Sequence, residues 1–144
     1  MKLVIQRVSK ARVTVNDTVR GAISKGLIVL LGVKQGDAAT AAYKLAQKLL
    51  SLRIMADENG KMNRSILDMQ GEILVVSQFT LYAETAGRRP GFTDAAPPDE
   101  ARTIYEHFVA TLRKSGLAIA TGEFGAYMHV ELTGDGPVTI IMEA

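Results

Sequence analysis

The chain has 144 residues, 47% of them hydrophobic, which is enough for one domain with a sizeable core. With 17 Lys and Arg residues against 15 Asp and Glu residues, the formal charge is +2, which permits a local basic patch but provides no nucleic-acid-binding tail. The absence of cysteine excludes disulfides, thiol nucleophiles and cysteine zinc sites. The longest apolar run, residues 27–31, is far too short to cross a bilayer, and the N-terminus lacks the apolar region of a signal peptide. We therefore expect a cytoplasmic protein.

The first part of the chain predicts strands followed by a helix. β-branched residues interspersed with polar ones predict strands across residues 3–33, with a turn at Asn16 and Asp17. Alanine and leucine then recur at helical spacing over residues 38–52, which predicts a helix with Asp37 as its N-cap.

The middle of the chain predicts a hairpin, a strand, a loop and a second helix. Asp-Glu-Asn-Gly at residues 57–60 is typical of a hairpin tip, and the apolar run 73–76 predicts a buried strand. Residues 83–98 show no periodicity, which indicates a functional or disordered loop. Pro98 suits the first turn of a second helix, and Gly116 is expected to end it.

The C-terminal residues predict strands again. Apolar and polar residues alternate over residues 126–133, and Gly134-Asp135-Gly136-Pro137 predicts a turn from which residues 138–142 return as another strand. We therefore predict an α/β fold in which residues 1–144 form a single domain, with a mixed, largely antiparallel sheet and two main helices.

The usual catalytic sets are missing. His107 is expected to be a solvated helix residue and His129 a surface or interface residue. The chain has no Gly-x-Ser-x-Gly elbow, no His-Glu-x-x-His motif and no cluster with metal-ligand spacing. A standard triad or metal hydrolase is not expected, and neither is a metal ion or a cofactor.

An unusual segment follows the apolar strand directly, where Ser77-Gln78-Phe79-Thr80 begins without a break. If Ser77 and Thr80 serve one site, the backbone must bend, and main-chain N–H groups would then point outward as in an oxyanion hole. The alternative is an ordinary strand end whose hydroxyl groups bond to the backbone.

Two further segments permit two readings each. Gly136-Pro137 suits a plain turn, but a proline in a strand region also belongs at an edge or a bulge. Arg88 and Arg89 could grip phosphates or form solvated surface.

Taken together, Ser77-Gln78-Phe79-Thr80-Leu81 and Gly136-Pro137-Val138-Thr139 resemble the signature pair of D-aminoacyl-tRNA deacylases, which hydrolyse the ester joining a D-amino acid to tRNA. The resemblance covers essentially the whole chain. Further matching motifs lie at residues 5–8, 30–33, 60–63, 89–90 and 121–130. One position departs from the family pattern, because many members carry Asn where this chain has Gly134, which puts the conformation of that loop in doubt.

The resemblance implies a homodimer with two active sites near its interface and aminoacylated tRNA as the substrate, with no DNA and no membrane among its partners. The pocket for the terminal adenosine would be lined on its catalytic side by Ser77, Gln78, Phe79 and Thr80. Its adenine side would be formed by Phe124, Gly125, Ala126 and Met128. Glycine mischarged onto tRNA would also be removed.

The resemblance further implies that Gly136-Pro137, in cis, enters the pocket of the partner subunit, with Thr139 in the same signature and with Arg7 holding the motif. We hypothesise that carbonyl oxygens of this motif crowd the space that an L side chain must occupy. Three rival interpretations are a nucleotide-binding module that stacks bases on Phe79 and Phe124, a purely structural dimer, and an esterase for small substrates.

Overall fold

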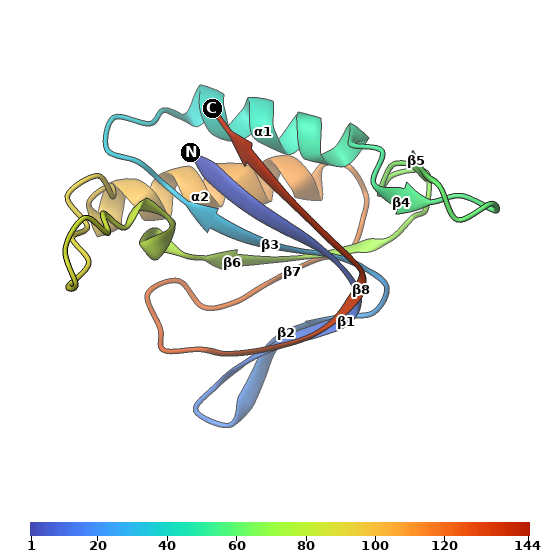
Figure 1. The fold of residues 1–144 in the computed structure, drawn as a ribbon, viewed down its shortest axis with the longest axis horizontal. Helices are drawn as coiled ribbons and strands as arrows, with labels where there is room; N and C mark the ends of the chain where they lie inside the picture. The colour runs from blue at the N-terminus through green and yellow to red at the C-terminus, as the bar shows by residue number, and fades with distance from the viewer.

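The N-terminal part of the chain forms three strands, of which the first, β1 (Lys2–Val15), is the longest (Figure 1). It is followed by β2 (Thr18–Ile23) and β3 (Gly26–Gly32). The two residues between β1 and β2, Asn16 and Asp17, have φ angles of 48° and 59°, the left-handed region that a two-residue hairpin turn requires. The strands and the turn predicted for this segment are confirmed.

The sheet is mixed, and β1 pairs antiparallel with three other strands. In the computed structural model, which describes residues 1–144, β3 and then β2 pair with successive parts of β1, and β8 (His129–Glu143) pairs along nearly all of it. Beyond β3, β6 (Glu72–Ser77) and β7 (Ile119–Thr121) are added in parallel. Because β3 and β6 are parallel, their carboxyl ends meet at one edge, with Leu31 opposite Ser77.

Two helices, α1 (Ala39–Ser51) and α2 (Pro98–Arg113), lie side by side against one face of the sheet (Figure 1). Alternate strand residues face them, so Ile73 and Val75 join the core beneath the helices while Leu74 and Val76 join a smaller cluster on the other face. The predicted α/β class, with a mixed sheet and two main helices in one domain, is confirmed. No helix is both long and apolar enough to span a bilayer.

The hairpin predicted at residues 57–60 is also present, between β4 (Met55–Ala56) and β5 (Met62–Arg64). The Asp57 carboxylate accepts hydrogen bonds from the main-chain N–H groups of Asn59 and Lys61, each at 2.9 Å. These bonds, above all the one from Lys61, hold the pKa of Asp57 below its usual value. The turn is thus stabilised by the aspartate side chain itself.

The prediction that Asp37 caps α1 is wrong, although the helix matches its predicted span closely. The N-cap is Ala38, and no side chain caps the helix. The Asp37 carboxylate instead accepts a hydrogen bond from the Lys34 N–H at 2.6 Å and lies 2.7 Å from the Met1 ammonium nitrogen. The carboxylate therefore pairs with the buried ammonium group of Met1, which is far away in the sequence. This tertiary contact overrides the local preference of aspartate for capping a helix.

The turn predicted at residues 134–137 is wrong as well. β8 continues past it in the same direction, and its pairing with β1 moves from Val8 opposite Gly134 to Gln6 opposite Thr139. Residues 135–138 therefore form a large bulge opposite the single residue Arg7. Long-range pairing with β1 on both sides of this segment decides its course, and local turn composition does not reveal such pairing.

Candidate active site

The carboxyl end of β6 bends sharply. Gln78 leaves the strand with φ −147° and ψ 82°, and a 3-10 helix, η1 (Phe79–Tyr82), follows at once. Gly32, at the end of β3, makes this close approach possible, since a Cβ atom there would lie 3.1 Å from the carbonyl oxygen of Gln78. The bend required for Ser77 and Thr80 to serve one site is therefore present.

The start of η1 leaves main-chain donors without partners inside the helix. The first residues of a helix have no carbonyl one turn earlier to bond to, so the N–H groups of Phe79 and Thr80 lack an intrahelical acceptor. The Leu81 N–H, by contrast, donates to the Gln78 carbonyl at 3.3 Å. The Thr80 hydroxyl accepts a hydrogen bond from the side-chain amide of Gln78. Neighbouring N–H donors and one hydroxyl are thus presented together.

A cavity of about 690 Å³ opens beside this bend. Its walls are mainly apolar, and none of its lining side chains carries a charge. Among the residues predicted from sequence, those that line it are Ser77, Gln78, Phe79, Phe124, Gly125, Ala126 and Met128. Two segments that are far apart in the sequence therefore meet in one cavity.

The other predicted site residues do not line this cavity. Thr80 lies next to it and is linked to the lining residue Gln78 by their hydrogen bond. Arg7, Gly136, Pro137 and Thr139 belong to β1 and β8, in and around the bulge. Within one chain, the two halves of the signature pair are therefore separate.

Phe124, one wall of the cavity, is held by two residues of α2. Its ring centroid lies 5.6 Å from that of Tyr105 and 4.8 Å from the guanidinium carbon of Arg102. The Tyr105 hydroxyl donates to the main-chain carbonyl of Val75 at 3.1 Å, which ties α2 to β6. Burial raises the pKa of Tyr105 to about 12, because a phenolate would lose its hydration there.

Sequence reasoning identified residues 83–98 as a functional or disordered loop but missed Phe92 as a site residue. Phe92 lines the cavity, and its ring packs edge-on against that of Phe79 with centroids 5.0 Å apart. A short antiparallel bridge between Glu84 and Gly91 gives the loop a hairpin-like base. An aromatic residue within an irregular, glycine-containing loop was the signal available in the sequence, since such a residue needs a packing partner.

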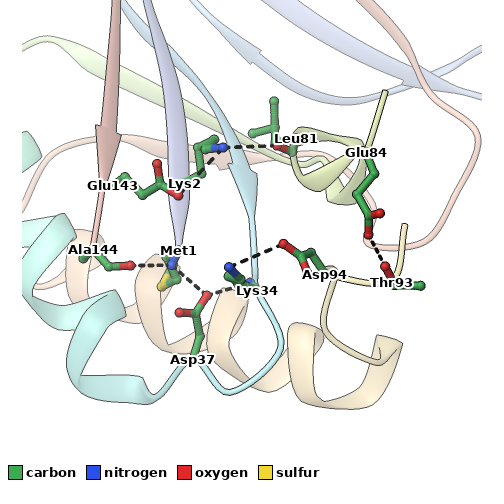
Figure 2. Close-up of polar contacts among 10 residues, drawn as sticks. All are labelled: Met1, Lys2, Lys34, Asp37, Leu81, Glu84, Thr93, Asp94, Glu143 and Ala144. Atoms are coloured by element: carbon green, nitrogen blue, oxygen red, sulfur yellow. Dashed lines mark hydrogen bonds and ion pairs between the residues drawn. The ribbon is translucent and has the colours of Figure 1, made fainter. Parts of the chain in front are cut away.

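Polar contacts tie this loop and η1 to the ends of the sheet, as Figure 2 shows. The Lys2 ammonium donates to the Leu81 carbonyl at 3.4 Å, lies 3.8 Å from a Glu143 carboxylate oxygen and sits 4.8 Å from the centroid of the Tyr82 ring. The Tyr82 hydroxyl is buried without a hydrogen-bond partner, and burial raises the pKa of Tyr82 above its usual value. Lys2 is thus placed to fix η1 against the sheet.

A second set of contacts in Figure 2 fixes the loop itself. Lys34 lies 3.4 Å from a carboxylate oxygen of Asp94, and the Thr93 hydroxyl donates to the Glu84 carboxylate. The ion pair and the hydrogen bond are both exposed and therefore contribute modestly to stability. They orient the loop that carries Phe92.

Arg7 organises the bulge in β8. Its Nε donates to the Asp135 carbonyl at 3.1 Å and lies 3.2 Å from the Asp135 carboxylate, while its Nη1 donates to the Ile54 carbonyl at 2.9 Å. The peptide bond between Gly136 and Pro137 is cis, and both residues are exposed. A largely buried guanidinium therefore holds the base of a segment that projects into solvent.

The histidines lie outside the cavity, since His107 and His129 are both exposed and neither lines it. No group of three or more His, Cys, Asp or Glu side chains has a geometry that could hold a metal ion. The chemical groups at the cavity are hydroxyls, two side-chain amides, aromatic rings and main-chain N–H donors.

Comparisons with known proteins place this geometry in a family. The family model described as D-Tyr-tRNA(Tyr) deacylase matches residues 4–143. The chain is 57% identical to a D-aminoacyl-tRNA deacylase of Heliobacterium modesticaldum, covering 99% of this chain and 96% of that protein. It is 56% identical to one of Roseiflexus sp., covering 100% of this chain and 94% of the relative.

Two solved structures share the fold. One, described as c-Myc DNA unwinding element binding protein, has a TM-score of 0.94 and 44% sequence identity, and the match covers 100% of this chain and 99% of that one. The other, described as a probable eukaryotic D-amino acid tRNA deacylase, has a TM-score of 0.87 at 17% identity, covering 98% and 97% of the two chains, and supports the fold alone. From the family match and these identities, the chain belongs to the D-Tyr-tRNA(Tyr) deacylase family, hydrolases that act on the ester bond of aminoacyl-tRNA.

Proposed function

We propose that the cavity binds the aminoacylated terminal adenosine of tRNA, and that the enzyme hydrolyses D-aminoacyl and glycyl esters while sparing L-aminoacyl esters. The observation that carries this proposal is the meeting of residues 77–79 with residues 124–128 in one cavity. Aromatic and apolar walls suit a nucleoside, and the hydroxyls and N–H groups at the bend suit the ester. Because aminoacyl-tRNA is the substrate, we also propose that the enzyme acts in the cytoplasm.

The proposed chemistry relies on main-chain electrostatics. The N–H groups of Phe79 and Thr80 would donate to the ester carbonyl oxygen as water adds to the carbonyl carbon and negative charge develops. Removing one such donor from a hydrolase typically slows turnover about 100- to 1000-fold, so these two groups would supply a large share of the acceleration. The tetrahedral intermediate then releases the ribose oxygen, which takes up a proton. The water would be oriented by Thr80 or by the neighbouring ribose hydroxyl of the substrate.

Thr80→Ala separates this mechanism from covalent catalysis by the threonine hydroxyl. Thr80 is hydrogen-bonded to an amide, which is not a base, so an activated hydroxyl lacks support in the structure. We expect Thr80→Ala to retain turnover within roughly 10- to 100-fold of the unmodified enzyme, since it loses a positioning group only. An alanine variant with no turnover, together with a trapped acyl-enzyme in the unmodified protein, would establish the covalent route instead.

We further propose a homodimer in which the bulge of each subunit enters the other's cavity. Three features support this: Gly136 and Pro137 are exposed, they do not line the cavity of their own chain, and Arg7 holds the base of the bulge. Carbonyl oxygens of the inserted bulge would occupy the space required by an L side chain, while a D side chain would point away. Glycine, which has no side chain, would be accepted.

The first experiment is deacylation of matched D-tyrosyl-, L-tyrosyl- and glycyl-tRNA by the purified protein. We expect rapid loss of the D-tyrosyl and glycyl esters and persistence of the L-tyrosyl ester. Loss of all three would contradict the chiral filter, and protection of all three would point to a binding module without hydrolysis.

Gly136→Ala tests the bulge as the filter, with Gly134→Ala as its matched control. Gly136 has φ 134°, and a Cβ atom there would lie 2.8 Å from the Val138 nitrogen, whereas nothing lies within 4 Å of a Cβ at Gly134. We expect Gly136→Ala to distort the bulge and hydrolyse L-tyrosyl-tRNA measurably, while Gly134→Ala stays selective. If both variants still spared L-tyrosyl-tRNA equally well, the bulge would not be the chiral filter. Gly134→Asn, which restores the family's common residue, checks separately whether Gly134 affects the loop.

Arg88 and Arg89 are proposed to contact tRNA phosphates away from the cavity. Both side chains are exposed in the loop that also carries Phe92, and neither forms an ion pair in the structure. Contacts of this kind release counterions, so the apparent affinity for tRNA should fall as salt rises. An affinity that does not change with salt would contradict phosphate contacts at these residues.

A further inference from the structure

The cavity lacks a cation, although the substrate proposed for it carries a phosphate. A terminal adenosine is joined through its 5′ oxygen to a phosphodiester, which must lie at or near the mouth of any cavity that holds the nucleoside. The lining contains no charged side chain, so within one chain a cation that meets this phosphate would come from a residue next to the lining. The inference below therefore rests on the proposed function.

Arg102 is such a residue. It follows Ala101, which lines the cavity, and its guanidinium carbon lies 4.8 Å from the centroid of the Phe124 ring, which also lines the cavity. Asp99 and Glu106 occupy the positions three before and four after it on α2, the spacing at which helical ion pairs form. Arg102 nevertheless forms no ion pair and stacks on Phe124.

The contact with the face of the Phe124 ring orients the guanidinium. Of its five N–H donors, those that do not point at the ring remain available. That planar set of donors matches two oxygens of a phosphate, a geometry that a lysine ammonium cannot reproduce. A single side chain would thus hold the Phe124 wall in place and present an anion-binding edge beside it.

We propose that Arg102 binds the phosphate on the 5′ side of the terminal adenosine, so that the site recognises a nucleotide and not merely a nucleoside. The same contact places the ester at the bend of β6, because the nucleoside is anchored at one end by the phosphate and along its length by the aromatic walls. Arg102 is a binding residue in this proposal and takes no part in the chemical step.

The test compares binding of 5′-AMP and adenosine, measured by calorimetry at low and high salt. We expect the unmodified protein to bind 5′-AMP roughly fivefold more tightly than adenosine, the scale of one exposed charge contact, and this preference should shrink as salt rises. Arg102→Met should bind the two ligands equally, and Arg102→Lys should keep part of the preference. Arg113→Met, which removes an exposed arginine at the other end of α2, should behave like the unmodified protein.

The contrary outcomes are distinct. A preference for 5′-AMP that survives in Arg102→Met would overturn the proposal, and so would equal weakening of both ligands, which would mean that Arg102 acts only through Phe124. Equal affinity of the unmodified protein for the two ligands would overturn it too. Failure of the proposed function would be seen in a different experiment, the deacylation assay, in which D-tyrosyl-tRNA would remain intact.

Discussion

At the residue scale, Tyr105 links the cavity wall to the sheet. Its ring packs against Phe124 and its hydroxyl donates to the Val75 carbonyl, which also accepts the Gly122 N–H at 3.0 Å. Tyr105→Phe keeps the ring and leaves Val75 with a donor, so we expect it to lower the free energy of unfolding by about 1 kcal/mol. Urea denaturation measures this change. Tyr43→Phe, at an exposed tyrosine of α1, is the matched control and should be neutral.

The same tyrosine predicts a dependence of stability on pH. Burial raises the pKa of Tyr105 from 10.0 to about 12, so the folded state disfavours the phenolate. Its contribution to stability is complete below pH 10 and is lost as the pH rises from 10 towards 12. We expect Tyr105→Phe to lose less stability than the unmodified protein as the pH rises from about 9 to about 11, because the ordinary pKa of tyrosine is about 10. Urea denaturation at each pH measures the two losses. If both proteins lost the same amount of stability over this pH range, the ionisation of Tyr105 would not be coupled to unfolding.

At the element scale, η1 is the most exposed part of the proposed catalytic machinery, and Lys2 fixes it to the sheet (Figure 2). Lys2→Met retains the length of the side chain but removes the donor to Leu81 and the charge over Tyr82. We expect a loss of stability below about 1 kcal/mol, because the contact is partly exposed, and a larger effect on turnover than on substrate affinity.

Steady-state kinetics on D-tyrosyl-tRNA separates these two effects for Lys2→Met, since kcat should fall while KM changes little. Lys2→Arg should restore part of kcat, because it returns both charge and donor. Lys44→Met, at an exposed lysine of α1, serves as the control. Unchanged kcat in Lys2→Met would mean that η1 holds its shape without this contact.

At the scale of the whole molecule, the proposed dimer needs an apolar surface close to the bulge. β8 exposes Leu132 and Ile141 on either side of residues 135–138, with 40% and 66% of these side chains accessible. Contiguous exposed apolar patches mark protein interfaces, and we propose that these two residues belong to the interface of the dimer. We expect Ile141→Glu to weaken dimerisation on the order of tenfold or more, because it would place a charge in the proposed apolar interface.

Sedimentation velocity over a range of concentrations measures this shift. Val19→Glu places the same charge at an exposed apolar position on β2 and is the comparison. A monomeric unmodified protein would contradict the dimer, and a dimer untouched by Ile141→Glu would place the interface away from β8.

Local sequence signals predicted those elements whose stabilising contacts are themselves local. The turn at Asn16 and Asp17, the hairpin at residues 57–60 and the start of α2 at Pro98 each depend on residues within a few positions. Hydrophobic periodicity likewise identified both helices and the buried strand that becomes β6, because the period reports which side faces the core.

The failures share a cause. Asp37 was predicted to cap a helix, but it pairs with the Met1 ammonium, which approaches only when β1 is in place. The turn at residues 134–137 became a bulge because β1 pairs with β8 on both sides of it. In each case a partner distant in the sequence supplied more stabilisation than the local option, and no local pattern encodes that partner.

The features of the candidate site also fall into those that local sequence predicts and those that depend on distant contacts. The sequence by itself determined the family, the bend after β6 and seven of the residues that line the cavity, because these residues belong to short contiguous motifs. Only the tertiary structure decided that Phe92 joins them, that Arg102 stacks on Phe124, and that Gly136 and Pro137 lie outside the cavity of their own chain. Contacts between surfaces of separate elements depend on how the helices and loops pack on the sheet, and that packing is a property of the whole fold.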